Sequence, residues 1–261
     1  MSTTADGAFA RRRVIVTGAG RGIGLAIARA FAEAGAEVVA VSRRSTDEIE
    51  GLVSTTATTF LALDLASPDA ATALAAAAGP VDVLVNNVGL ATARPSGFLS
   101  ITDDEWMTSF TLNFLSAMRT TRAVLPGMLG RPGANIVNIA SVNAELPDPA
   151  VIDYSAAKAA LASFGKSLSQ EYGGRIRVNW INPGPVATDL WLGHGGIAET
   201  FSAAGAGAPQ EVADAAVAGT ATKRFSRPEE VAAIALFLAG DAATNITGTG
   251  IRIDGGLVAT L

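Results

Sequence analysis

Short apolar runs alternate with helix-like segments along nearly the whole chain. The apolar runs are rich in valine and isoleucine, as expected of parallel strands that are buried on both faces. We expect strands at residues 14–16, 37–41, 60–65, 81–85, 134–140, 175–181 and 250–253. The segments with helical composition lie at residues 25–34, 68–78, 102–129, 153–171, 209–218 and 228–239.

This alternation predicts an α/β fold: one doubly wound parallel sheet of about seven strands flanked by helices, formed by residues 11–261 as a single domain. Residues 1–10 are small and polar, and we expect a disordered tail there. Residues 189–208 combine glycine and alanine with a few large apolar side chains. They are expected to form a mobile lid over a substrate, or else a plain surface excursion in which His194 is merely solvated.

Composition excludes several classes of function. A net charge of −5 argues against nucleic acid or an anionic membrane as the main partner, since both require a basic surface. The chain has no cysteine and one histidine, so neither a cysteine site nor a multi-histidine metal centre is expected. With no stretch that resembles a signal peptide or a membrane span, we expect a cytoplasmic protein. Charged residues make up only 16%, which favours burial of surface between subunits.

A glycine-rich turn joins the first predicted strand to the first predicted helix. Residues 17–24 read Thr-Gly-Ala-Gly-Arg-Gly-Ile-Gly. Glycines let the backbone approach a pyrophosphate, which then lies on the free N–H groups of the helix. The spacing differs from Gly-x-Gly-x-x-Gly, and a turn without a ligand is the alternative.

The residues after the second strand bear on the choice of dinucleotide. Ser42 and Arg43 stand where an acidic residue would accept hydrogen bonds from a free ribose hydroxyl, and Arg21 approaches from the glycine turn. Arginine favours a 2′-phosphate, so the sequence predicts NADP rather than NAD, unless these arginines are only solvated. Asp64 and Leu65, at the end of the third strand, are candidate adenine contacts.

Tyr154 and Lys158 lie four residues apart in a predicted helix and therefore share one face. We expect the ammonium of Lys158 to lower the pKa of the Tyr154 phenol and so to favour proton exchange with a carbonyl oxygen. A surface pair on an ordinary helix is the alternative. Ser141 and the segment Asn86-Asn87-Val88-Gly89 each follow a strand, where open sheets bind ligands; turn chemistry alone would also explain the latter.

Together these motifs resemble the short-chain dehydrogenase/reductase family over nearly the whole chain. Residues 17–24 are similar to its glycine motif and residues 86–89 to its Asn-Asn-Ala-Gly motif, with Val88 in place of alanine. Asn113, Ser141, Tyr154 and Lys158 match its catalytic tetrad in order and spacing. Pro183, Gly184 and Thr188 match its segment after the sixth strand, although Trp180 is unusually bulky there.

The resemblance implies a Rossmann fold and an NADP-preferring ketoreductase acting on a small carbonyl or alcohol. Ser141 would bind the substrate oxygen, Tyr154 would exchange its proton, Lys158 would hold the nicotinamide ribose, and Asn113 would position a water beside Lys158. The cofactor-binding residues implied are Gly18, Arg21, Gly22, Ile23, Gly24, Ser42, Arg43, Asp64, Leu65, Asn87, Gly89, Tyr154, Lys158, Pro183, Gly184, Val186 and Thr188. A homotetramer formed through the last two helices and the final strand is also implied, and it would explain the apolar residues 231–238.

Two other functions are compatible with these motifs. A 3-oxoacyl-(carrier protein) reductase would need a basic patch near the cleft, for which Arg131, Arg175 and Arg177 are candidates. A non-catalytic NADP-sensing or scaffold protein would be expected to have lost Tyr154 or Lys158, and both are present.

Overall fold

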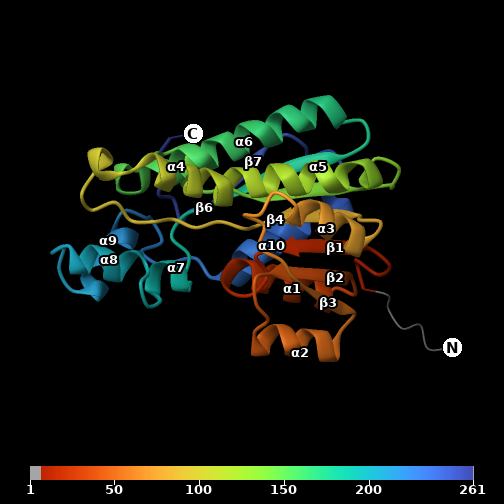
Figure 1. Cartoon of the computed structure of the whole chain (residues 1–261), viewed down its shortest axis with the longest axis horizontal. Coiled ribbons are helices and arrows are strands. Elements are labelled where there is room, and N and C mark those ends of the chain that lie inside the picture. The colour runs from red at the N-terminus through yellow and green to blue at the C-terminus, as the bar shows by residue number, and fades with distance from the viewer. Residues whose placement is uncertain (1–6, 261) are drawn as a thin grey trace.

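The computed structural model describes residues 7–260, and its centre is one sheet of seven parallel strands in the order β3-β2-β1-β4-β5-β6-β7 (Figure 1). The strands are β1 (Arg13–Thr17), β2 (Glu37–Ser42), β3 (Thr58–Ala62), β4 (Val83–Asn86), β5 (Asn135–Ile139), β6 (Arg177–Pro183) and β7 (Gly250–Ile253). The winding direction reverses between β1 and β4, and such a switch point opens a crevice at the carboxyl ends of the strands. The predicted doubly wound parallel sheet is confirmed.

Helices cover both faces of this sheet. They are α1 (Gly22–Glu33), α2 (Asp47–Thr55), α3 (Ala70–Ala78), α4 (Asp103–Phe110), α5 (Ser116–Met128), α6 (Ile152–Tyr172), α7 (Asp189–Leu192), α8 (Ile197–Ala203), α9 (Pro209–Ala218) and α10 (Pro228–Ala239). Helix α1 packs on α10, while α3 packs on α5 and α5 on α6. Helices α7, α8 and α9 lie together at one side, away from β1 to β3 (Figure 1).

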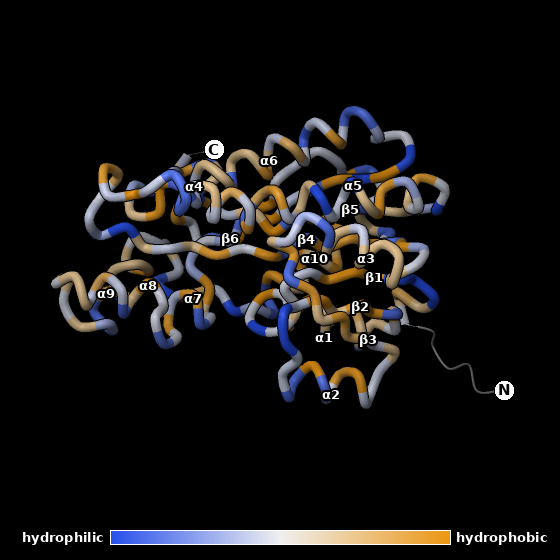
Figure 2. The backbone as a smooth tube through the Cα atoms, in the orientation of Figure 1, coloured by the Kyte–Doolittle hydropathy of each residue, from blue (hydrophilic) through white to orange (hydrophobic). Residues whose placement is uncertain are grey.

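The strands separate two apolar cores. In β1, Val14 and Val16 belong to the core under α1 and α10, and Ile15 belongs to the core under α3 and α5. All three side chains are fully buried, which explains why β1 is a continuous hydrophobic run rather than an alternating one. Figure 2 shows the same hydrophobic character along the central strands.

Several elements differ from those expected from the sequence, and three of them bear on the site. Helix α2 was not predicted; Thr46 caps it by accepting a hydrogen bond from Ile49 N, and acidic residues in its first turn suit the helix dipole. The predicted helix at 102–129 is interrupted by a π turn, η2 (Thr111–Leu115), between α4 and α5. Strand β3 ends at Ala62, so Asp64 and Leu65 lie in the following loop.

The folded domain begins earlier than residue 11, the start that the sequence predicts. Phe9 is buried and packs edge-on against Phe31 of α1, with ring centroids 4.9 Å apart. Residues 7–10 therefore belong to the folded domain and not to a tail, because a large aromatic ring gains more from burial than a short segment loses in freedom. The rest of the predicted tail, residues 1–6, lies outside the described residues.

The apolar residues 231–238 are explained only in part by the fold of one chain. Val231, Ala235 and Leu238 are fully buried in the core that α10 shares with α1, whereas Phe237 keeps 43% of its surface exposed. The tetramer, and a contribution of this helix to it, stay predictions. Within residues 7–260, no helix has the length and apolarity that a membrane crossing requires.

Candidate active site

A cleft of about 1350 Å³ runs along the carboxyl ends of the strands, from the glycine turn to α7, α8 and α9. It brings together residues that are far apart in the sequence because parallel strands end at one edge. The predicted site residues that line it are Gly18, Arg21, Gly22, Ile23, Ser42, Arg43, Asp64, Leu65, Asn87, Gly89, Ser141, Tyr154, Lys158, Pro183, Gly184, Val186 and Thr188. Gly24 and Asn113 were also predicted, but they lie behind the lining.

The glycine turn has backbone positions where only glycine fits. Gly18 and Gly22 have φ angles of 66° and 56°, a region that other residues rarely adopt. A Cβ on Gly24 would lie 2.2 Å from Gly18 O and 2.4 Å from Asn87 Nδ2, so this glycine permits close packing of α1 on the turn. The open backbone at the start of α1 fits the pyrophosphate of a dinucleotide.

Positive charge gathers at the adenosine end of the cleft. Arg43 and Arg44 are exposed directly after β2, and the Ser42 hydroxyl donates to Arg44 O at 2.6 Å. Arg21 is also exposed, and its guanidinium pairs with Asp189 of α7 at 3.3 Å. Guanidinium groups in this position fit a ribose phosphate, and an acidic partner for a free ribose hydroxyl is missing from the segment after β2.

Two hydroxyl groups converge in the middle of the cleft. Ser141 follows β5 and caps the short helix η3 (Val142–Ala144), where its Oγ accepts a hydrogen bond from Asn143 N at 3.1 Å. Tyr154 lies in the first turn of α6. Burial raises the pKa of the Tyr154 phenol, and a hydrogen bond with the Ser141 side chain opposes this shift. The phenol is therefore protonated at neutral pH and beside a second donor.

Lys158 lies one turn further along α6 and is buried, with 3% of its surface exposed. Its Nζ donates to Ile139 O at 2.8 Å and lies 5.6 Å from the centroid of the Tyr154 ring. Burial lowers the pKa of this ammonium to about 7. The expectation that Lys158 lowers the pKa of Tyr154 is wrong for this arrangement, because the amine lies over the ring face and burial of the phenol dominates.

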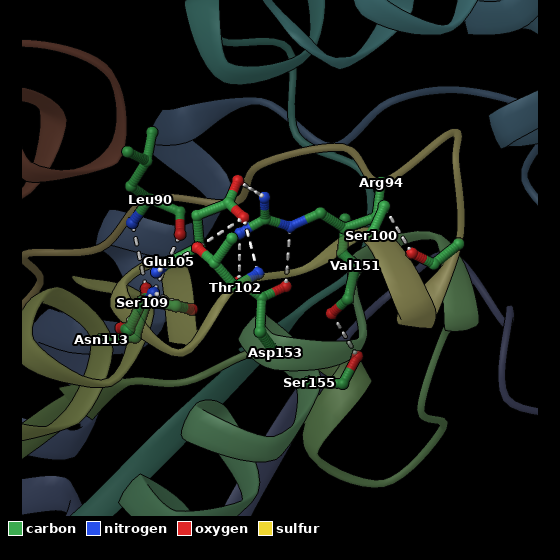
Figure 3. Close-up of polar contacts among 11 residues, drawn as sticks. Leu90, Arg94, Ser100, Thr102, Glu105, Ser109, Asn113, Val151, Asp153 and Ser155 are labelled. Atoms are coloured by element: carbon green, nitrogen blue, oxygen red, sulfur yellow. Dashed lines mark hydrogen bonds and ion pairs between the residues drawn. The ribbon is translucent and has the colours of Figure 1, made fainter. Parts of the chain in front are cut away.

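Asn113 belongs to the π turn and holds the loop that follows β4 (Figure 3). Its Oδ1 accepts a hydrogen bond from Leu90 N at 3.0 Å, and its Nδ2 donates to Leu90 O and Ser109 O at 2.8 and 2.9 Å. A Cβ on Gly89 would lie 2.9 Å from Asn113 Oδ1 and 3.1 Å from Lys158 Nζ. Gly89 thus allows the Asn113 amide and the Lys158 amine to approach each other.

A partly buried ionic cluster beside Tyr154 was missed by the sequence reasoning. Arg94, in the loop after β4, contacts Asp153 of α6 and Glu105 of α4 at 2.7 and 2.6 Å (Figure 3). The side chains of Arg94 and Asp153 are 9% and 1% exposed. A charged residue immediately before Tyr154 was the available signal, but its partner lies 59 positions away.

The other residue missed was Asn143, whose Oδ1 accepts the Ser141 hydroxyl at 3.0 Å. The Ser-x-Asn sequence at a strand end was the available signal, since such side chains bond to nearby backbone. His194 is fully exposed, pairs with Glu199 at 3.2 Å and does not line the cleft. The predicted lid contains α7 and α8, which carry Trp191 and Phe201 on the cleft side.

Comparisons with known proteins agree with this architecture. A family model described as short chain dehydrogenase matches residues 12–193. D-erythrulose reductase of Gallus gallus is 37% identical, over 97% of this chain and 98% of that protein. The 3-oxoacyl-[acyl-carrier-protein] reductase FabG of Chlamydia muridarum is 32% identical, over 94% and 97%. L-sorbose reductase of Gluconobacter frateurii, solved with NADPH and L-sorbose, superposes with a TM-score of 0.88 at 31% identity, over 98% of this chain and 100% of that one.

Proposed function

The chain belongs to the short-chain dehydrogenase family of oxidoreductases, which act on alcohol and carbonyl groups, and we propose that it is an NADPH-dependent ketone reductase, or the matching dehydrogenase of a secondary alcohol, with Tyr154 as general acid and base. The observation that carries this proposal is the pair of hydroxyls from Ser141 and Tyr154 in the middle of a cleft built for a dinucleotide.

These two residues divide the work on the substrate oxygen. Ser141 turns its hydroxyl from Asn143 Oδ1 to the carbonyl oxygen, donates a hydrogen bond to it and holds it beside the phenol. Tyr154 transfers its proton to that oxygen, so that C=O becomes CH–OH, and the tyrosinate regains a proton from solvent. Bound NADPH would supply the hydride that the carbonyl carbon takes up.

Lys158 and Asn113 support the proton transfer. A Lys158 amine with a pKa of about 7 exchanges protons readily at neutral pH, and it lies beside the nicotinamide end of the cleft. Asn113 lies close to this amine and fixes the loop that carries Gly89. We assign Lys158 to the ribose hydroxyls and to proton supply for Tyr154, and Asn113 to positioning a water beside it.

The charge distribution supports NADP as the cofactor. Arg43 and Arg44 provide cations for a 2′-phosphate, and Gly18, Gly22 and the start of α1 provide backbone N–H groups for the pyrophosphate. The NADPH complex of L-sorbose reductase supports the same choice. A homotetramer and a cytoplasmic location remain predictions from the family and from the sequence.

The carrier-protein alternative loses its proposed docking patch. Arg131 pairs with Asp82, just before β4, and Arg177 begins β6 and donates to Leu238 O at 2.6 Å. Arg131 and Arg177, like Arg175, lie at the amino ends of the strands, whereas the cleft lies at their carboxyl ends. They cannot guide an acidic carrier toward Tyr154.

The proposed function is tested by NADPH oxidation over a panel of ketones, with NADH as the comparison. We expect consumption of NADPH with at least one ketone and a preference for NADPH over NADH. A protein that binds NADP⁺ but reduces none of the ketones, and oxidises none of the matching alcohols, would support the sensing or scaffold alternative instead.

A further inference from the structure

The part of the cleft beyond Ser141 and Tyr154 is apolar. Ala91, Val151 and Ile197 form a buried cluster there, and the ring of Tyr154 packs against it together with Trp191 and Phe201. These side chains come from the loop after β4, from the segment before α6 and from the lid. The rings of Trp191 and Phe225 pack edge to face, with centroids 5.8 Å apart, and Trp191 lines the cleft.

Each polar side chain at this end has at least one polar atom bonded to another protein group. Asp148 Oδ1 accepts a hydrogen bond from Ala150 N at 2.8 Å, and Asp189 pairs with Arg21. Asn143 Oδ1 accepts the Ser141 hydroxyl. Hydroxyls of a polyhydroxylated ketone that face Val151, Ile197 and Phe201 would lose hydration without gaining partners from these apolar side chains, which opposes its binding.

The charges that line the cleft are unevenly distributed. Arg43 and Arg44 lie at the adenosine end, Lys158 is buried, and Arg21 is paired with Asp189 at 3.3 Å. The Asp148 carboxylate lines the substrate end, where a substrate with a carboxylate or a phosphate would meet like charge.

The rim of the cleft offers a further apolar surface. Leu146, in the segment between β5 and α6, lines the cleft and keeps 45% of its surface exposed. A bound apolar group would cover Leu146 and remove it from water, so the rim as well as the interior favours an apolar ligand.

We propose that the substrate is an uncharged ketone carrying an apolar ring or branched alkyl group next to its carbonyl, or the corresponding secondary alcohol. The carbonyl lies at Ser141 and Tyr154, and the apolar group lies among Val151, Trp191, Ile197 and Phe201, with Leu146 at its outer edge. This inference rests on the proposed function, because it takes the two hydroxyls as the carbonyl site.

The test compares kcat/KM with NADPH for 2-butanone, 2-hexanone and acetophenone, and for erythrulose and acetoacetate. We expect kcat/KM to rise about fourfold per added methylene from 2-butanone to 2-hexanone, which is the transfer free energy of one buried methylene expressed as a ratio. The kcat/KM for acetophenone should exceed that for erythrulose by at least about a hundredfold. Erythrulose or acetoacetate as the better substrate would overturn the assignment.

Matched variants locate the apolar group. Trp191→Ala should lower kcat/KM for acetophenone at least about tenfold more than it lowers kcat/KM for 2-butanone. Leu192→Ala is the control, because Leu192 is 51% exposed and does not line the cleft. If Trp191→Ala does not fold, Leu146→Ala takes its place, because the exposed Leu146 side chain contributes little packing. The proposal would be contradicted if the ratio of kcat/KM for acetophenone to that for 2-butanone were the same in the variant and in the native protein.

A binding measurement separates this inference from the proposed function. Isothermal titration calorimetry of 1-phenylethanol into the NADP⁺-loaded Tyr154→Phe variant, which keeps the ring but lacks the base that oxidation of the alcohol needs, should show saturable binding with a negative heat-capacity change, the mark of apolar burial. If no ketone is reduced but 1-phenylethanol binds in this way, the proposed function fails and the apolar site stands. If ketones are reduced but 1-phenylethanol and acetophenone do not bind, the apolar site is wrong.

Discussion

The Arg94 guanidinium donates to both carboxylate oxygens of Asp153, at 2.7 and 3.3 Å, and Asp153 immediately precedes Tyr154. The pair joins the loop after β4 to the first turn of α6. Ala150 O accepts a hydrogen bond from Arg94 N at 2.8 Å, which adds a second link across the same junction. The wall of the cleft and the helix that carries Tyr154 are thereby held in one orientation.

Arg94→Met should destabilise the protein by about 3–5 kcal/mol, because it leaves the buried Asp153 carboxylate without a partner. Urea unfolding measures this change. The double variant Arg94→Met/Asp153→Leu should recover most of the loss, since it removes both charges together. Asp241→Asn, which breaks the exposed pair with Arg12, is the control and should cost about 0–1 kcal/mol.

Tyr154→Phe removes the proton donor and keeps the ring in its apolar cluster. Turnover should fall at least about a hundredfold, the usual contribution of a general acid. The Kd for NADP⁺, measured by calorimetry, should change little. Turnover equal to that of the native protein would remove Tyr154 from the mechanism.

Gly24→Ala should destabilise the domain and weaken NADP⁺ binding, because its Cβ would lie 2.2 Å from Gly18 O in the glycine turn. Gly51→Ala offers a matched control. Gly51 lies inside α2 with nothing within 4 Å of an added Cβ, and the change should stabilise the protein by about 0.5–1 kcal/mol. Equal effects of the two substitutions on stability would contradict the close packing of Gly24.

The buried Lys158 amine should make stability depend on pH. Its pKa falls from 10.5 to about 7 on folding, so between these values the unfolded chain holds a proton that the folded chain has released. The unfolding free energy therefore rises with pH across that window. Below the window both states hold the proton, and the full cost of burying the charged amine lowers the stability of the folded protein. The difference in unfolding free energy between the native protein and Lys158→Met should rise by up to about 1.4 kcal/mol per pH unit. The measurement covers about pH 7.5 to 9.5, which lies inside that window. If the difference in unfolding free energy between the two proteins stays constant over this range, the amine is not desolvated.

Arg43→Asp should shift cofactor preference toward NADH, because it replaces a cation for the 2′-phosphate with an acceptor for a free ribose hydroxyl. The ratio of kcat/KM for NADPH to that for NADH should fall at least about tenfold. Arg175→Asp, with the same charge change at the opposite edge of the sheet, is the control. An unchanged ratio in Arg43→Asp would refute the phosphate assignment.

Local patterns in the sequence were enough to predict the sheet, most helices and most of the cleft lining. Valine-rich runs bury both faces of a strand, glycines mark the turn at α1, and the four-residue spacing of Tyr154 and Lys158 fixes their common face. Each of these signals lies within one element or at its end, where neighbouring residues decide the conformation.

Only the tertiary structure could decide how distant segments meet. It pairs Arg94 with Asp153, buries Phe9 against α1, and places Arg131 and Arg177 at the amino ends of the strands, away from the cleft. It also places the Lys158 amine over the Tyr154 ring in a desolvated site. Burial and through-space charge depend on packing between elements, and no spacing within a single element records them.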